Sequence, residues 1–279
     1  MKQKILGGLL AALALAGCAG HVSFLNVAPN APARIPATLY RPEGPGPFPA
    51  VVLLHGCEGV SASHHDWGRW FRERGYVALV LDSWTSRGLT EICSKEGPEI
   101  DRFWRFDDGI GALRYLQSLG FVDPARIGAI GWSNGGVYSM ALINGPSLER
   151  AVKRGLTLPN PGYAAAVAVY PGGCFSLVAE RVVKPLLVLI GEADDWTLAF
   201  ECAQMVEAMR SRGSDATIVT YRGAYHYFDV EGQPLQVLPN VENRNRPGGC
   251  CGATVGYNAA AAADARRRVE EFFARHLKR

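Results

Sequence analysis

The sequence predicts an α/β fold in which helices cover both faces of a mostly parallel central sheet. Apolar runs rich in β-branched residues, such as 50–54 and 185–190, alternate with segments of helical periodicity. Such runs are typical of strands buried on both faces, and their alternation with helices favours parallel pairing. Neither a G-x-G-x-x-G sequence nor a Walker A sequence is present, which argues against a dinucleotide or nucleoside triphosphate as ligand.

The first half of the domain is expected to end in a long loop. Residues 37–40 are predicted to form an edge strand, and the Pro/Gly-rich segment 42–49 is expected to be a turn without regular structure. A strand at 50–54, a helix at 63–74 with one aromatic face, and a strand at 76–81 are expected to follow. Residues 83–106 show no periodic pattern, and a loop of this length is often functional.

The second half continues the alternation. Asp107 and Asp108 suit a helix N-terminus, and Gly120 follows that helix. Further strands are predicted at 126–132, 163–170, 185–190 and 217–221. Helices are predicted from 134 to about 143, from 199 to 212, and over a C-terminal segment that ends near Leu277. The connections 144–162 and 231–256 contain Pro, Gly and Asn and are expected to be loops.

The N-terminus has the features of an export signal. Lys2 and Lys4 precede an uncharged apolar run, and small residues follow up to Cys18. This pattern is typical of a secretory signal, and the run is too short to span a membrane stably. The end of the signal, residues 15–18, resembles a bacterial lipobox, which implies lipidation of Cys18 and a cell envelope lipoprotein. A plain secretion signal, cut at a small residue such as Ala16 or Ala19, is the alternative.

The expected organisation is a signal peptide at 1–17, a tether at 18–33 and one α/β domain at 34–279. Removal of the signal takes away two lysines and no acid, so the formal charge falls from +3 to +1. This near-neutral charge argues against nucleic acid as a partner. With 48% hydrophobic and 20% charged residues, the composition is that of an ordinary globular protein. The sequence gives no indication of the oligomeric state.

Six cysteines besides Cys18 occur in a chain that is expected to be exported, where disulfides persist. Cys57 is predicted to pair with Cys93, and Cys174 with Cys202, because the loops that carry each pair should meet at one end of the sheet. Free buried thiols are the alternative, since cysteine often serves as a small core residue. No C-x-x-C pair is present, so the sequence does not indicate a structural zinc site.

The segment from Gly128 to Gly136 is predicted to be a strand, a sharp turn and a helix. Gly131 and Gly135 flank Ser133 in a G-x-S-x-G pattern. In such an elbow the glycines leave room for a strained turn that exposes the serine hydroxyl at the edge of the sheet. Ser133 is therefore the candidate nucleophile. An ordinary Gly-rich turn is the alternative, which only the rest of the chain can exclude.

A serine nucleophile needs a base and a third group that orients the base. His226 is favoured as the base because it follows a predicted strand near the C-terminus, in the chain order Ser, acid, His. The other histidines lie in less suitable places, and His55, at a strand end, is expected to be structural. Asp194 and Asp195 both follow a strand. Asp194 is preferred as the acid, and Asp195 is expected to serve a turn or a helix cap.

The oxyanion of an acyl-transfer intermediate needs two aligned donors. In this architecture one is the amide of the residue after the nucleophile, here Asn134, and the other is an amide in the loop after an early strand. The segment His55-Gly56-Cys57 supplies that loop, and the Cys57 amide is the candidate. No metal or cofactor is implied.

Four segments together resemble the dienelactone hydrolase family of α/β hydrolases. They are Leu54-His-Gly-Cys57, Gly131-Trp-Ser-Asn-Gly-Gly136, Gly191-Glu-Ala-Asp-Asp-Trp-Thr197 and Ala224-Tyr-His-Tyr-Phe-Asp229, in that order. The resemblance covers roughly residues 35–278 and implies the α/β-hydrolase fold. In that family the acid is the third residue after the glycine of the third segment, which corresponds to Asp194.

The sequence departs from the founding members of that family in ways that concern the substrate. They use a cysteine nucleophile where Ser133 stands, and a glutamate where this chain has Gly56. They also place an arginine shortly after the histidine to hold a substrate carboxylate, whereas residues 228–231 here supply acids. Three arginines in the long loop are candidates for a carboxylate site or, equally, for pairs with Asp107 and Asp108: Arg87, Arg102 and Arg105.

The expected function is hydrolysis of carboxylic esters or lactones through an acyl-serine intermediate. A peptidase or amidase with the same triad is one alternative, although little of the chain remains for a domain that gates peptides. A non-catalytic envelope lipoprotein that kept the fold is the other, because fold does not fix function.

Overall fold

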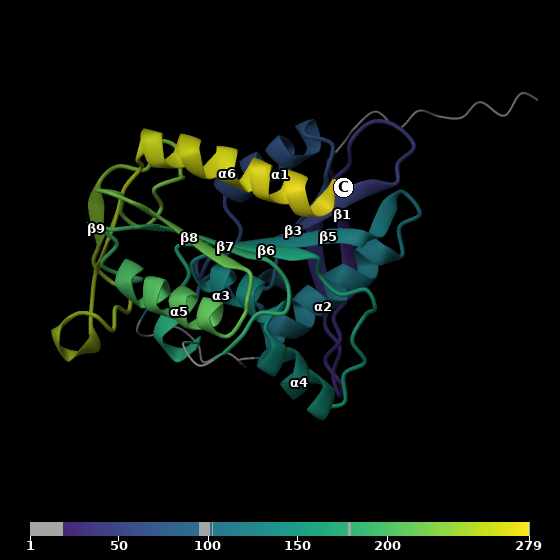
Figure 1. Cartoon of the computed structure of the whole chain (residues 1–279), viewed down its shortest axis with the longest axis horizontal. Coiled ribbons are helices and arrows are strands. Elements are labelled where there is room, and N and C mark those ends of the chain that lie inside the picture. Colours follow the sequence, from purple (N-terminus) through teal and green to yellow (C-terminus); the bar gives the residue numbers. More distant parts are fainter. Residues whose placement is uncertain (1–18, 95–100, 102, 178–179, 279) are drawn as a thin grey trace, which may run out of the picture.

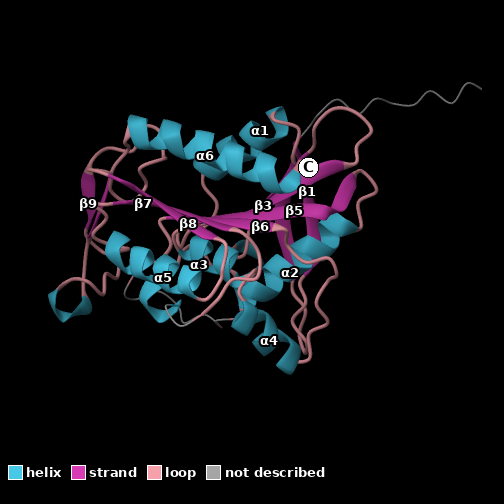
Figure 2. Ribbon diagram, viewed as in Figure 1, coloured by secondary structure: helices cyan, strands magenta, loops and turns pink. Residues whose placement is uncertain are grey.

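A computed structural model describes residues 19–94, 101, 103–177 and 180–278 of the chain. Most of the polypeptide wraps around one twisted sheet of eight strands, with helices on both of its faces (Figures 1 and 2). The expected signal peptide, Cys18 and Arg102 lie outside the described residues. Within those residues, no helix combines the length and the apolar character that crossing a membrane requires.

The strand order in the sheet is β1-β2-β4-β3-β5-β6-β7-β8. β1 pairs antiparallel with β2, and β2 antiparallel with β4, whereas all pairs from β4 to β8 are parallel. The mostly parallel sheet is thus confirmed. The strands are β1 (Ala19–Leu25), β2 (Arg34–Tyr40), β3 (Phe48–Leu54), β4 (Val77–Leu81), β5 (Val122–Trp132), β6 (Ala165–Val169), β7 (Leu186–Gly191) and β8 (Ala216–Tyr221).

The central strands consist almost entirely of apolar residues, which suits their position between two layers of helix. Every residue of β4, β6 and β7 is buried, as a continuous apolar run between two layers of helix requires. A sheet of this kind directs the carboxyl ends of its parallel strands to one edge, where ligands of open α/β sheets bind. β3, β5, β7 and β8 are each followed there by a segment that was expected to carry function.

Two layers of helices cover the sheet, as Figure 2 shows. α1 (Ala62–Glu73) and α6 (Ala259–Leu277) lie on one face. The other face carries α2 (Trp104–Gln117), α3 (Asn134–Ala141), α4 (Gly145–Lys153) and α5 (Ala199–Ser211). α6 buries Ala261, Ala265, Val269, Phe273 and Leu277. Their four-residue spacing places them on one helix face, which packs against the sheet.

Residues 19–33, which make up nearly all of the segment 18–33 expected to be a tether, belong to the domain. β1 pairs along its whole length with β2 and takes the sheet edge that β2 was expected to occupy. The amide of Asn26 donates to the carbonyl of Ala33 at 2.9 Å, and its side chain donates to Asp108 at 2.9 Å. The prediction was wrong because only Phe24 of β1 is buried, so the strand depends on its partner rather than on its own apolar pattern.

Other differences concern short elements. The expected loop 144–162 contains α4, which Asn144 caps by accepting a hydrogen bond from the Ser147 amide at 2.9 Å. The expected loop 231–256 contains a small antiparallel pair, β9 (Gln236–Leu238) and β10 (Ala253–Val255). β3 begins at Phe48, inside the expected turn. Short 3₁₀ turns occur at Thr85–Arg87 (η1), Cys174–Leu177 (η2) and Pro247–Gly249 (η3).

Candidate active site

Ser133 lies in a strained turn between β5 and α3. Its backbone has φ 51° and ψ −116°, a region that residues with a side chain rarely adopt. The Ser133 amide donates to the carbonyl of Val169 at 2.9 Å, and its own carbonyl accepts from the Gly136 amide at 2.9 Å. These bonds hold the turn in place. The predicted elbow is confirmed, and such strain is typical of functional residues.

The glycines of the elbow allow three backbone segments to approach closely. A Cβ atom at Gly131 would overlap the carbonyl of Gly135, and one at Gly135 would overlap the carbonyl of Leu54, at the end of β3. Glycine is therefore required at both positions for a steric reason. This packing places Ser133 beside the loop that follows β3, where the Cβ position of Gly56 lies 3.6 Å from the Ser133 Cβ.

Asp194 and His226 form a buried pair. Oδ2 of Asp194 accepts from Nδ1 of His226 at 2.7 Å, and both side chains are fully buried. Asp194 also accepts hydrogen bonds from the amides of Trp196 and Thr197, each at 2.9 Å, and from the Thr197 hydroxyl at 2.9 Å. Because the carboxylate only accepts, Nδ1 carries the imidazole proton and Nε2 presents its lone pair.

Nε2 of His226 is buried and has no hydrogen-bond partner among the described residues. The ring lies between aromatic side chains, with centroid distances of 4.4 Å to Tyr170 and 4.8 Å to Trp196. A buried nitrogen without a partner is costly, and such atoms are common where a reacting group is to be bound. Catalytic hydrogen bonds are often long without substrate, so this geometry suits a base.

The neighbouring Asp195 has a different role. Its carboxylate accepts from the amide and the hydroxyl of Thr254, each at 2.8 Å, and from Arg246 at 2.7 Å. These bonds fasten the segment that leads into β10. The preference for Asp194 agrees with this geometry. Asp194 also holds the amides of the turn before α5, and that helix has no side-chain cap at its N-cap residue, Leu198.

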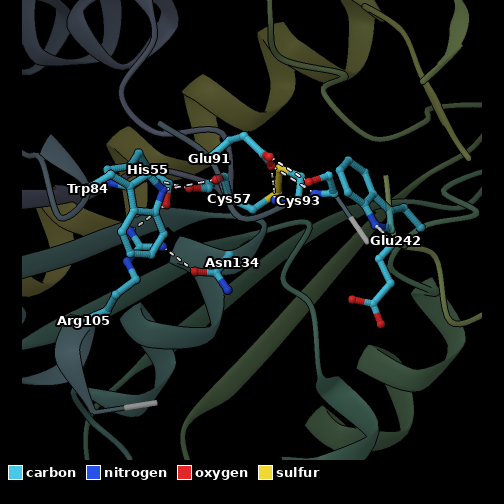
Figure 3. Close-up of a disulfide and its surroundings, with 11 residues drawn as sticks. His55, Cys57, Trp84, Glu91, Cys93, Arg105, Asn134 and Glu242 are labelled. Atoms are coloured by element: carbon cyan, nitrogen blue, oxygen red, sulfur yellow. Dashed lines mark hydrogen bonds between the residues drawn. A yellow bond between two sulfur atoms is a disulfide. The ribbon is translucent and has the colours of Figure 1, made fainter. Parts of the chain in front are cut away.

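The loop after β3 is fixed around Cys57, as Figure 3 shows. Cys57 forms a disulfide with Cys93, and its carbonyl accepts from the Trp84 indole at 3.1 Å and from the Ile92 amide at 2.9 Å. Its amide makes no hydrogen bond within the described residues, nor does the amide of Asn134 at the start of α3. Asn134 follows Ser133 directly, and Cys57 lines the same cavity as Ser133, so the oxyanion role of these two amides stays a prediction.

Arg105 connects this loop to α3 through hydrogen bonds. Its guanidinium donates to the carbonyl of His55 at 2.7 Å and to the side chain of Asn134 (Figure 3). Burial lowers the pKa of Arg105 to about 10, so it remains a cation at neutral pH. The side chain therefore links the two backbone segments that carry the candidate oxyanion amides. Sequence patterns did not indicate this role, because the contacts join residues far apart in the chain.

His55 is structural, as expected. Its Nε2 accepts from the Ser83 amide at 3.1 Å, so Nδ1 carries the proton and donates to the carbonyl of Gly56 at 2.7 Å. Burial, with the charge of Arg105 as a second cause, lowers the pKa of His55 well below its usual value. A permanently neutral imidazole with both nitrogens bonded supports the loop but has no free atom for catalysis.

Of the three loop arginines, Arg102 lies outside the described residues, and Arg87 and Arg105 bind groups of the protein itself rather than forming a carboxylate site. Arg87 pairs with Asp108 through two hydrogen bonds of 2.8 Å, and Arg105 binds the groups named above rather than Asp107 or Asp108. Asp107 instead pairs with Arg154. The expected pairing with Asp107 or Asp108 is therefore correct for Arg87. Arg105 forms neither such a pair nor a carboxylate site among the described residues.

A cavity of about 510 Å³ opens above Ser133. It lies at the carboxyl ends of the parallel strands, and both predicted disulfides, which the structure confirms, form part of its wall. The other two cysteines of the described residues, Cys250 and Cys251, are paired with each other. Apolar and polar groups line the cavity, including Val137, Phe175, Trp196, Glu201, Glu242 and Arg244. The candidate nucleophile and both candidate oxyanion residues thus line one cavity of a size that suits a small ligand.

Comparison with known proteins agrees with this geometry. A protein from a Bradyrhizobium species, named "Probable 2-oxo-3-(5-oxofuran-2-ylidene)propanoate lactonase", is 24% identical over 74% of this chain and 84% of its own. Among solved structures, a dienelactone hydrolase from Anabaena variabilis superposes with a TM-score of 0.61 at 15% identity, covering 93% of this chain and 99% of its own.

A dienelactone hydrolase-like promiscuous phosphotriesterase from metagenomic libraries superposes with a TM-score of 0.64 at 18% identity, over 93% of this chain and 99% of its own. At these identities the solved structures establish the fold alone. The model of the dienelactone hydrolase family matches residues 35–277, which is most of the chain. The protein therefore belongs to the dienelactone hydrolase family.

Proposed function

We propose that this protein hydrolyses carboxylic esters or lactones through an acyl-serine intermediate, with Ser133 as nucleophile, His226 as base and Asp194 as the group that orients it. The observation that carries the proposal is the buried 2.7 Å bond between Asp194 and His226, which leaves Nε2 of His226 without a partner in the described residues, together with the strained turn of Ser133. This is the arrangement that activates a serine hydroxyl.

In the first step Nε2 of His226 takes the proton of Ser133 while Oγ attacks the substrate carbonyl carbon. The tetrahedral intermediate collapses as the carbon–oxygen bond to the alcohol breaks, and the imidazolium returns its proton to that oxygen. A water molecule, deprotonated by the same Nε2, then attacks the acyl carbon. The bond to Oγ of Ser133 breaks as the imidazolium returns its proton to Oγ, which releases the acid and restores the serine. Throughout, Asp194 stabilises the imidazolium through Nδ1.

The amides of Cys57 and Asn134 are the proposed oxyanion donors. Each such donor contributes about 3 kcal/mol to transition-state stabilisation in related enzymes. The disulfide at Cys57, the two hydrogen bonds on its carbonyl and the Arg105 bridge hold these amides in place before substrate arrives. Preorganised donors need not be reoriented during the reaction, which is the source of their effect.

The charges around the cavity favour substrates without a carboxylate. Glu201 and Glu242 line the cavity, and its arginine, Arg244, pairs with Glu242 at 3.1 Å. Glu201 makes no hydrogen bond or ion pair within the described residues. The arginine that holds a carboxylate in the founding members has no counterpart after His226. The Bradyrhizobium relative is named for a propanoate substrate, whereas we propose that this chain acts on uncharged esters or lactones.

The test is hydrolysis of a matched panel by wild type and Ser133→Ala. The panel contains uncharged aryl esters, the same esters with a carboxylate on the acyl chain, simple lactones and aryl amides. The proposal predicts turnover of uncharged esters or lactones that Ser133→Ala lacks. Turnover confined to amides would favour a peptidase, and no Ser133-dependent turnover of any substrate would favour a binding protein.

We further propose that the chain is exported and anchored to a membrane through a lipid on Cys18. The basic and apolar N-terminus, the lipobox-like end of the signal and three disulfides in the folded domain support export. Because β1 begins at Ala19, an anchor on Cys18 would hold the edge of the sheet next to the membrane.

Metabolic labelling with a radioactive fatty acid tests the anchor. Wild type expressed in a bacterium should incorporate label and sediment with membranes, and Cys18→Ser should do neither. Secretion of an unlabelled wild type with its N-terminus at residue 17 or 20 would support the plain signal instead.

A further inference from the structure

A single buried carboxylate joins the segments that carry the nucleophile and the base. Asp229 is 5% exposed and lies three residues after His226. Its Oδ2 accepts from the indole nitrogens of Trp132 at 2.8 Å and Trp67 at 3.1 Å. Its Oδ1 accepts from the hydroxyl of Tyr170 at 2.7 Å. The three donors come from α1, the end of β5 and the residue after β6.

Two of these donors are adjacent to groups of the proposed reaction. Trp132 is the residue before Ser133, so its side chain fixes the strand from which the elbow begins. The Tyr170 ring packs against the His226 ring, with 4.4 Å between centroids and a tilt of 51° between the ring planes. Its carbonyl accepts from the Thr197 hydroxyl at 3.3 Å, and that hydroxyl also bonds to Asp194 at 2.9 Å. Asp229 therefore connects the residue before Ser133 with the aromatic ring that packs against His226.

The backbone strain of the molecule is concentrated in the same place. The non-glycine residues with positive φ in the described part of the chain are Ser133 at 51°, Tyr170 at 36° and Tyr227 at 62°. All three lie beside the proposed reacting atoms, and Tyr227 sits between His226 and Asp229 in sequence. Strained residues persist only where their surroundings hold them firmly. Through Trp132, Tyr170 and its own loop, Asp229 holds all three segments.

We propose that Asp229 is a positioning residue that sets the distance and orientation of the His226 ring relative to the Ser133 hydroxyl. The inference rests on the proposed serine hydrolase function. Asp229 does not touch the reacting atoms. It acts because its carboxylate, which belongs to the loop of His226, binds both Trp132 and Tyr170. A small displacement of reacting groups is enough to reduce a catalytic rate strongly.

The first test compares Asp229→Asn with wild type on an uncharged aryl ester. Asparagine keeps the shape but loses the charge and one accepting oxygen, so it cannot accept from both indoles and the tyrosine as aspartate does. We expect kcat to fall about 10- to 100-fold, while KM changes by no more than about twofold. The rate at which a fluorophosphonate labels Ser133 should fall by a similar factor.

Asp107→Asn is the matched control. Asp107 is also buried and accepts two hydrogen bonds from Arg154, which lines a different cavity from the one that Ser133 lines. Asp107→Asn should lower the midpoint of thermal unfolding yet leave kcat of the folded protein near the wild-type value. Equal kcat losses in the two variants, or a kcat of Asp229→Asn within about twofold of wild type, would overturn the positioning role.

Conservative changes in the donors keep the proposal testable if Asp229→Asn does not fold. Tyr170→Phe and Trp132→Phe each remove one donor to Asp229 while keeping an aromatic ring. Each should lower kcat with little change in KM, and Asp229→Asn combined with either should be less harmful than the product of the single effects. Wild-type kcat in both donor variants would contradict the proposal.

Ser133→Ala distinguishes a failure of the proposed hydrolase function from a failure of the positioning role of Asp229. If Ser133→Ala loses activity while Asp229→Asn and both donor variants retain wild-type kcat, the positioning role alone is wrong. If Ser133→Ala remains as active as wild type, the proposed function is wrong.

Discussion

Asp194 and Asp195 are adjacent, yet only Oδ2 of Asp194 meets Nδ1 of His226, at 2.7 Å, while the carboxylate of Asp195 binds Thr254 and Arg246. Asp194→Asn should lower kcat by about 10⁴, because an amide no longer fixes the imidazole tautomer. Asp195→Asn should keep kcat within about threefold and lower thermal stability instead. Steady-state kinetics and thermal unfolding of both variants check this, and the opposite pattern would assign the acid to Asp195.

The fold was largely predictable from the sequence, and so were the positions of the candidate triad residues at strand ends, because these signals are local. Ser133, Asp194 and His226 each follow an apolar strand, and parallel strands bring their carboxyl ends together. β1 was missed because it depends on pairing with β2, and α4 was missed because its Pro and Gly residues resemble a loop. The side chains of Arg105 and Asp229 bind segments that are far apart in the sequence. Contacts of this kind do not produce a periodic pattern in the sequence, so they could not be predicted from it.

The glycine requirement at the elbow gives a second prediction. Gly135→Ala should lower the free energy of unfolding by about 1–3 kcal/mol, because its Cβ would overlap the carbonyl of Leu54. The same change should reduce activity, since Gly135 and the Ser133 turn move together. Gly172→Ala is the control, because a Cβ there meets its nearest neighbours at 3.8 Å, an ordinary contact. Denaturant unfolding that ranks Gly172→Ala as the more harmful change would contradict the packing.

The two predicted disulfides should differ in their effect on catalysis. Replacing both Cys57 and Cys93 by serine removes a cross-link between residues 36 apart, which should cost about 3–4 kcal/mol of stability. It should also lower kcat, because the proposed oxyanion amide of Cys57 is no longer held. Replacing Cys174 and Cys202, 28 residues apart, should cost similar stability with a smaller loss of kcat. Equal kcat losses would argue against the role of the Cys57 amide.

Acid stability should depend on His64. Burial lowers the pKa of His64 to about 3, from the ordinary value of 6.5. The unfolded chain therefore binds one more proton at this residue between pH 6.5 and 3, so stability is complete above pH 6.5 and is lost as the pH falls. The loss approaches about 1.4 kcal/mol per pH unit.

His64→Gln tests this dependence without removing the helix cap. His64 accepts from the Ser61 amide at 3.1 Å at the start of α1, and glutamine serves the same capping position. Denaturant unfolding of the variant between pH 7 and 4 should show a shallower loss of stability than the wild type. Parallel curves would mean that His64 is not held neutral in the folded state.

The identity of the nucleophile is tested most directly by mass spectrometry after treatment with a fluorophosphonate at neutral pH. The proposed mechanism predicts one adduct per chain, on the peptide that contains Ser133, formed in step with the loss of esterase activity and absent from Ser133→Ala. An unmodified Ser133 in a protein that still hydrolyses esters, or an inactivating adduct on another residue, would contradict it.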